Sequence, residues 1–301
     1  MFANVLNGVR ETVRNYRMVL LIWAWYAMMA ATAAAPALNW WRRAFDHSIE
    51  ASTLLGGFNF AVLADLIKYD YVGAFGLLTS GLTGAMMLAV GASSFIMGGM
   101  LKVISGTGAS RGLMHRCIVG AGYFFWRFFR LMLIGGTCTV AAGVVIMLAL
   151  FAVESPLFAN ASEAATYAWL VFNLIVLAMS CGLFLLALDY ARIQVVIDDA
   201  RGMFRVYFRA PGFVARHAIT AYGMAVLVVV AVAALMLGYV AYETVSPVAS
   251  SWTLLILLFA MQQVILVLRV GLRVSLIDAE FRYAERMTGT AALEAARTSA
   301  T

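Results

Sequence analysis

Charge is scarce in this sequence: Asp, Glu, Lys and Arg make up 12% of its 301 residues, whereas 64% are hydrophobic. A soluble domain is roughly a quarter charged and about half apolar. The mean hydropathy of +0.91 departs from a soluble composition in the same direction. The shortage of charge excludes an ordinary soluble fold and predicts an all-α, polytopic bundle of membrane helices.

Ionisable side chains are missing from the cores of six apolar runs, at about 18–38, 71–101, 131–153, 167–188, 218–242 and 252–273. A helix needs about 20 apolar residues to cross a bilayer, so each run is predicted to span the membrane. Ionisable groups at depth usually carry function. Their absence argues against proton-coupled transport and against an intramembrane protease. We expect one transmembrane domain over residues 1–288, followed by a flexible tail at 289–301.

Cysteine and histidine are also rare. None of the three cysteines lies in a predicted outer loop or in a CxxC pair, so neither a disulfide framework nor a zinc site is expected. The three histidines lie near predicted interfaces rather than on facing helices, which argues against b-type haem. The segment SGTGASRG follows a membrane helix and lacks the GK[ST] ending of a phosphate loop. No metal or cofactor is therefore predicted.

The basic residues are unevenly distributed along the chain. With a cytoplasmic N-terminus, 18 of the 21 Lys and Arg residues fall on the inner side, and only Arg42, Arg43 and Lys68 fall outside. This asymmetry predicts a protein integral to the cell (inner) membrane, with both termini in the cytoplasm. Anionic lipid head groups on the inner side account for the net charge of +6, so nucleic acid is not expected as a partner.

Segments at both faces of the membrane are predicted to lie on its surface. Residues 2–17 place apolar side chains at helical spacing with arginines between them, which is typical of an interfacial helix. Residues 39–70 suggest one or two short helices on the outer surface. The ATAAAPA that ends the first span resembles a signal-peptidase site. Nearby tryptophans and a tyrosine favour a retained anchor instead.

The most charged stretch is residues 189–217. Arg201, Arg205 and Arg209 recur every four residues and so share one helical face, before Pro211 and Gly212, which are predicted to end the helix. This pattern indicates either a surface helix that stiffens the hairpin or a contact for anionic lipid or an acidic partner.

A second aromatic and basic segment precedes the third span. Arg127 and Arg130 lie among the aromatic residues of 123–129, which suits the head-group region. We therefore add both arginines to the predicted lipid or partner contacts. The sequences SRGL at 110–113 and ARGM at 200–203 lie 90 residues apart and resemble each other weakly. This similarity is compatible with an internal duplication or with chance.

Small and polar residues inside the spans have two interpretations each. One face of the second span carries Gly84, Gly91, Ser94 and Gly98, which predicts close helix packing, with a substrate path as the alternative. The most polar core residues are predicted to form interhelical hydrogen bonds, with substrate binding as the alternative; they are Asn173, Gln262 and Gln263.

Three segments mark the layout of the spans: FIMGGML closes the second, GYFFWRFFRLML opens the third and LDYARIQVVIDD leaves the fourth. This layout resembles a group of uncharacterised bacterial six-helix membrane proteins, similar in organisation to the membrane domain attached to some glycerophosphodiester phosphodiesterases. The resemblance implies a helical inner-membrane protein and supplies no catalytic residues.

These features predict a non-enzymatic scaffold or a subunit of a larger membrane complex. Its expected partners are membrane lipids and other membrane proteins or a second copy of the chain. A permease for a neutral or lipid-like molecule is the main alternative. An interfacial enzyme acting on lipid would need a polar cluster near Asp189, Arg192 and Asp198, and no such cluster is evident in the sequence.

Overall fold

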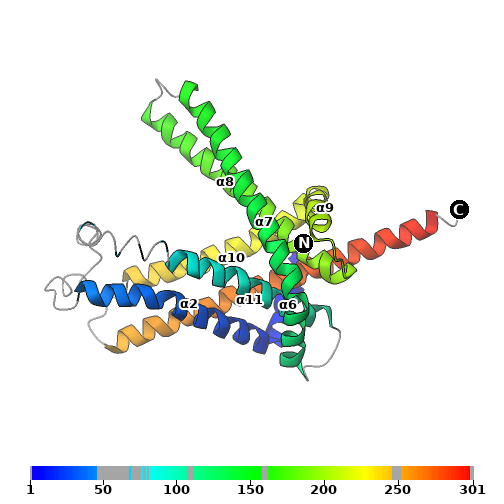
Figure 1. The fold of residues 1–301 in the computed structure, drawn as a ribbon, viewed down its shortest axis with the longest axis horizontal. Helices are drawn as coiled ribbons and strands as arrows, with labels where there is room; N and C mark the ends of the chain where they lie inside the picture. The colour runs from blue at the N-terminus through cyan, green and yellow to red at the C-terminus, as the bar shows by residue number, and fades with distance from the viewer. Residues whose placement is uncertain are drawn as a thin grey trace. The chain divides into compact units, whose positions relative to one another are not determined.

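The computed structural model describes residues 2–45, 68, 73, 76, 79, 81–106, 112–157, 162–245 and 252–298. Within these ranges the elements are helices: α1 (Phe2–Arg14), α2 (Tyr16–Phe45), α6 (Leu82–Ser105), α7 (Leu113–Leu157), α8 (Glu163–Asp198), α9 (Met203–Arg216), α10 (Ala218–Val245) and α11 (Trp252–Thr298) (Figure 1). Most of the predicted outer segment at 39–70, and most of the first part of the predicted second span, lie outside the described residues.

Six of these helices are long and apolar enough to cross a membrane, namely α2, α6, α7, α8, α10 and α11. The prediction of an all-α membrane helix bundle is thereby confirmed. The physical reason is that a bilayer core supplies no water to the backbone. An isolated apolar segment satisfies its own peptide groups only as a helix.

Three helices continue well past the predicted spans. Helix α7 has 45 residues and includes the aromatic connector, while α8 has 36 and α11 has 47. At about 1.5 Å per residue, each is far longer than the roughly 30 Å of a hydrocarbon core. Residues 289–298, assigned from the sequence to a flexible tail, are helical and belong to α11.

By its internal contacts the chain divides into two compact units, and the single transmembrane domain over residues 1–288 stays a prediction. One unit comprises Met1–Arg14, Ser94–Val230 and Arg273–Thr301, and the other comprises Asn15–Ser93 and Ala231–Leu272. We call them the first and second units. Helices α6, α10 and α11 each contribute one part to each unit.

The first unit is built on a hairpin of α7 and α8, against which α9 packs (Figure 1). Its core contains side chains from all three helices that are less than 2% exposed: Phe128, Leu131, Tyr190, Ile193 and Tyr207. In the second unit, the Trp23 Nε1 of α2 donates a hydrogen bond of 3.3 Å to Oε1 of Gln263 in α11.

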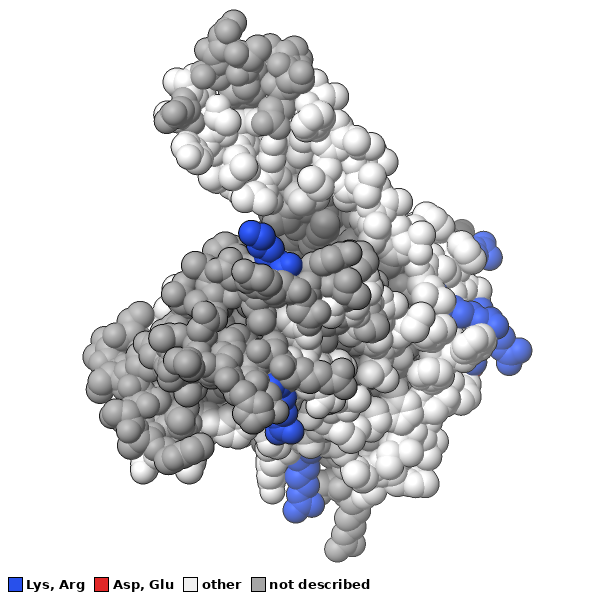
Figure 2. All heavy atoms as spheres, turned by 60° about the vertical axis from the view of Figure 1, so that its left-hand side comes forward, with Lys and Arg blue, Asp and Glu red and all other residues white. Residues whose placement is uncertain are grey.

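The outer surface of the spans is largely apolar. On the face drawn in Figure 2, most of the described surface is uncharged, and the charged side chains seen there are Lys or Arg. On the α7–α8 hairpin, Phe151 is 69% exposed and Tyr167 is 71% exposed. In a bilayer, such exposed apolar side chains would be compatible with lipid chains or with another membrane helix, because both are apolar.

Candidate functional site

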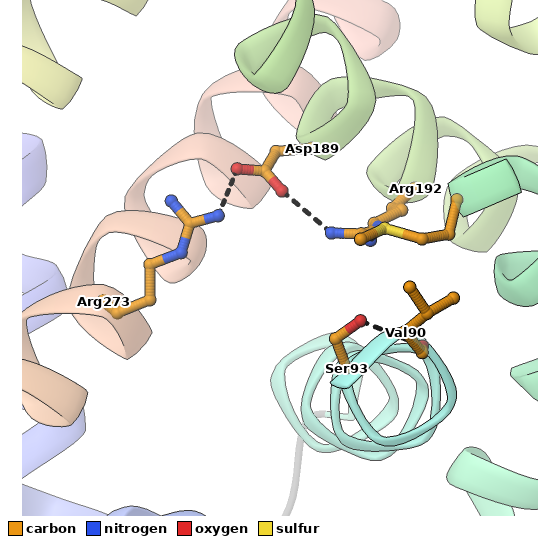
Figure 3. Close-up of polar contacts among 6 residues, drawn as sticks. Val90, Ser93, Asp189, Arg192 and Arg273 are labelled. Carbon is orange, nitrogen blue, oxygen red and sulfur yellow. Dashed lines mark hydrogen bonds and ion pairs between the residues drawn. The ribbon is translucent and has the colours of Figure 1, made fainter. Parts of the chain in front are cut away.

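A buried ion-pair cluster lies where the end of α8 meets α11 in the first unit. Asp189 and Arg192 are only 4% and 5% exposed. One oxygen of Asp189, Oδ1, accepts a hydrogen bond from Arg192 Nη1 at 3.2 Å, and Oδ2 accepts one from Arg273 Nη2 (Figure 3). Asp189 therefore lies between two guanidinium groups, one from its own helix and one from α11.

Arg192 extends the cluster to a third helix. Its Nη2 lies 2.9 Å from the sulfur of Met132 in α7. Burying charges is costly unless they are paired and hydrogen-bonded, and the pairing of Asp189 with Arg192 meets that need for the two buried groups, whereas the Arg273 side chain is 50% exposed. The ion pairs thus join α8 to α11, and the sulfur contact joins α8 to α7.

Glu280 of α11 is the unexpected member of this cluster. It is 0% exposed, and neither carboxylate oxygen has a hydrogen-bond partner among the described residues. Asp189, Arg273 and the fully buried Tyr190 are its electrostatic neighbours. A buried carboxylate without a donor is expensive to keep ionised, and a neighbouring carboxylate adds to that expense. Within the described ranges, the packing therefore buries the Glu280 carboxyl group without a hydrogen bond to offset the cost.

Helix α1 packs against the same part of α11. Ser275 Oγ donates to Thr12 Oγ1 at 3.0 Å, with both side chains buried. A Cβ on Gly8 would lie 2.4 Å from the carbonyl oxygen of Ser275, so the two backbones touch. Beside this contact, a cavity of about 480 Å³ is lined by Asn7, Arg10, Glu11, Val13, Arg14 and Arg282.

Most of this cluster is not predicted from the sequence. Asp189 and Arg192 come together as the interfacial-enzyme hypothesis required, but Asp198 is exposed at the end of α8. The sequence predicts Arg273 at the end of the sixth span and does not single out Glu280. The signal that identifies them is the continuation of apolar side chains past Arg273, where Val274, Ile277 and Phe281 are buried. Among the described residues, no three His, Cys, Asp or Glu side chains are placed to hold a metal ion.

Helix α9 is amphipathic, with its inner face formed by Met203, Val206, Tyr207, Ala210 and Val214. The predicted break at Pro211 and Gly212 is wrong, because α9 continues to Arg216. Proline removes one helical hydrogen bond, but the buried face continues across it from Ala210 to Val214. Tertiary packing therefore outweighs the local signal.

The five predicted contact arginines fall into two groups. Arg205 and Arg209 are exposed on α9, and Arg201 is exposed in the turn before it. On α7, Arg127 forms an ion pair with Asp199, and the guanidinium of Arg130 lies 5.0 Å from the ring centroid of Trp126.

Asp199 marks the turn between α8 and α9. It caps α8 in the left-handed conformation, with φ of 45°. Hydrogen bonding by the Arg127 guanidinium holds the pKa of Asp199 below its usual value. The hydroxyl of Tyr123 donates to the same carboxylate at 3.3 Å. This turn is thereby tied to α7.

The predicted small-residue face of α6 is divided. A Cβ on Gly98 would lie 3.2 Å from Phe124 Cβ of α7, and Ser94 is fully buried. At Gly84 and Gly91 an added Cβ meets nothing within 4 Å. The tightest α6–α7 contacts include one at Gly99, not singled out from the sequence, where a Cβ would lie 2.7 Å from both the carbonyl oxygen and the sulfur of Cys117.

The three polar core residues do not form one site. Gln263 accepts the hydrogen bond from Trp23, whereas the adjacent Gln262 is exposed. The Oδ1 of Asn173 on α8 is buried and has no partner among the described residues. Each therefore has a separate environment.

Comparisons of the sequence with protein-family models, with curated proteins and with solved structures found no match. The fold defines the class: the described residues are all-α and include six helices long and apolar enough to span a membrane. The likeness to bacterial six-helix membrane proteins stays a prediction.

Proposed function

We propose that the protein is a non-enzymatic subunit or scaffold of a larger membrane complex, lying in the cell membrane with both termini in the cytoplasm. The observation that carries the proposal is on the outer surface of the α7–α8 hairpin. At Gly136 of α7 and Gly182 of α8, an added Cβ would meet no heavy atom within 4 Å. Within the described part of the chain, no side chain fills the space beside these glycines.

The neighbouring glycine behaves differently. A Cβ on Gly135 would lie 2.8 Å from Leu188 and 3.1 Å from Tyr207, so Gly135 serves packing within the chain. Small residues on a membrane helix let another backbone approach closely. Exposed Leu133 and Val140 flank Gly136 in the sequence. These features favour a second transmembrane helix, from another protein or another copy, as the occupant of this face.

The pair of adjacent glycines supplies a matched test. Gly136→Leu is expected to leave the chain folded and to abolish its association with the partner, because it fills only the outer space. Gly135→Leu is expected to lower the thermal unfolding temperature, because it collides with Leu188 and Tyr207. Extraction in mild detergent followed by native mass spectrometry measures the association. A monomeric wild-type particle, or an unchanged complex with Gly136→Leu, would overturn the proposal.

A permease for a neutral or lipid-like molecule is the second candidate. The observation that favours it is the buried group of Asp189, Arg192 and Glu280, since ionisable groups within membrane bundles often mark a route for polar groups. Dithionite quenching of fluorescent lipids in reconstituted vesicles tests it. Protein-dependent quenching of inner-leaflet lipid that Glu280→Gln slows would support a permease, whereas quenching equal to that of empty vesicles would contradict lipid movement.

A further inference from the structure

We infer that the outer face of α9 binds the phosphate groups of anionic lipids at the membrane surface from which α8 and α10 emerge. The inference does not depend on the proposed membrane complex.

The first argument is the short tether at each end of α9. Only residues 199–202 separate it from α8, and only His217 separates it from α10. Both neighbours contain candidate membrane spans, at Ala164–Asp198 and Ala218–Tyr242. An extended chain covers at most about 3.6 Å per residue, so α9 cannot move far from the ends of α8 and α10. Head groups are therefore the nearest extended source of anions.

The second argument is the division of the outer face into two flanks. Successive helical residues are about 100° apart. One flank therefore presents Phe204 and Phe208, which are 66% and 64% exposed. The other presents Arg205, Arg209 and Arg216, all of them exposed. An apolar flank beside a basic flank is typical of a helix lying at the boundary between acyl chains and head groups.

The third argument is the absence of competing acids. Helix α9 contains no Asp or Glu. Asp199 in the preceding turn is engaged by Arg127. Among the described residues, no carboxylate lies within ion-pair distance of Arg205 or Arg209. Guanidinium groups bind phosphate through two parallel hydrogen bonds, so both arginines are available for lipid phosphate.

An acidic protein is a weaker match for the same face. It would neutralise the arginines but leave Phe204 and Phe208 without an apolar environment unless it also carried a matching groove. A lipid supplies both chemistries together, with a phosphate at the head group and acyl chains just below it. The combination of flanks therefore favours lipid.

The test uses the full chain in a neutral detergent, titrated with short-chain phosphatidylglycerol or short-chain phosphatidylcholine and followed by native mass spectrometry. Each arginine near an anionic surface contributes about fivefold to affinity. We expect the double variant Arg205→Gln/Arg209→Gln to bind phosphatidylglycerol about 25-fold more weakly and phosphatidylcholine as before. The double lysine variant at the same positions should retain most of the affinity, since it keeps the charge.

Arg42→Gln is the matched control, since Arg42 is an exposed arginine of α2 and should leave binding unchanged. Phe204→Ala/Phe208→Ala should weaken the binding of both lipids. Equal binding of phosphatidylglycerol by wild type and the double glutamine variant would overturn the inference. So would displacement of phosphatidylglycerol by millimolar inorganic phosphate, or tighter binding of an acidic peptide than of the lipid.

Discussion

Asp189 joins helices that are distant in the sequence. Its carboxylate accepts hydrogen bonds from Arg192 and Arg273, and the Asp189 and Arg192 side chains are almost completely buried. Removing one member of such a group leaves an uncompensated charge in a medium that solvates it poorly. Substitutions that break the Asp189–Arg192 pair are therefore expected to destabilise the first unit strongly.

Asp189→Asn is expected to destabilise the protein by about 3–5 kcal/mol, because it leaves buried Arg192 without its counter-charge. The control is Asp198→Asn, an exposed residue of the same helix, which should change stability by less than about 0.5 kcal/mol. Denaturant unfolding in detergent, followed by tryptophan fluorescence, measures both. Equal stabilities for the two variants would show that the buried ion pair is dispensable.

Glu280→Gln should keep or raise the unfolding temperature. The amide has nearly the same shape as the carboxyl and carries no charge to bury, whereas Glu280 has no hydrogen-bond donor among the described residues. Glu285→Gln, at an exposed position of the same helix, is the control. A marked loss of stability in Glu280→Gln alone would mean that the carboxylate is ionised and held by Arg273.

The Asp199–Arg127 pair should make stability depend on pH. Because the pairing holds the pKa of Asp199 below its unfolded value of about 3.9, its stabilisation is complete above that value. It is lost as the pH falls through the lower, folded value. Wild type should therefore unfold at a higher temperature than Asp199→Asn at pH 7, and the difference should vanish in acid.

Asparagine also tolerates the left-handed conformation at this position, so Asp199→Asn tests the charge rather than the backbone. Melting curves of both proteins between pH 7 and pH 3 measure the difference. A difference that is constant across the range would contradict the role of the ion pair.

At the scale of elements, α6 and α7 are held together by close backbone approach. The contact depends on the absence of side chains at Gly98 and Gly99, where α7 lies within a few ångströms. Gly122, further along α7, has nothing within 4 Å of an added Cβ. At some glycines of these helices, a neighbouring helix occupies the position where a Cβ would lie. At others, that position is open.

Gly99→Ala is expected to cost about 1–3 kcal/mol, since the new methyl group would meet the carbonyl oxygen and sulfur of Cys117 at 2.7 Å. Gly122→Ala should be neutral or stabilise by up to about 1 kcal/mol, because alanine favours the helix and meets nothing. Thermal unfolding of the two single variants measures the contrast. If Gly99→Ala were the more stable of the two, the described α6–α7 contact would be wrong.

At the scale of the whole molecule, charge determines the predicted orientation. Lys and Arg gather in segments that alternate spans place on one side, and the positive-inside rule assigns that side to the cytoplasm. If the same Lys and Arg residues were distributed evenly among the loops, the net charge would be unchanged, but the positive-inside rule would predict no orientation. The placement of the charge along the chain therefore matters more than its total.

Cysteine labelling in intact cells tests this orientation. In a chain whose native cysteines are replaced by serine, Arg42→Cys should react with a membrane-impermeant maleimide. Arg286→Cys should react only after the membrane is permeabilised, since the sixth span is predicted to return the chain to the cytoplasm. Both positions are exposed or partly exposed, so access through the protein does not limit the reaction. The reverse pattern of labelling would refute the predicted topology.

Local sequence was enough to predict that six segments span the membrane. It was not enough to predict where each helix begins and ends. Each apolar run must be helical in lipid, because the backbone has no other partner for its peptide groups. Whether a helix continues beyond the run depends on its neighbours. Helix α7 begins at Leu113 and buries Phe124 and Phe128, and α9 passes through Pro211 because its inner face remains packed.

The sequence by itself determined that this is an all-α membrane protein with six spans, because hydropathy and helical length are properties of single segments. Only the tertiary structure decided that Asp189 meets Arg273, 84 residues away, that Glu280 is buried with no donor among the described residues, and that Gly135 and Gly136 face different surroundings. These are relations between helices. They depend on which helix faces pack together. The spacing of residues within one helix does not predict which other helix packs against it.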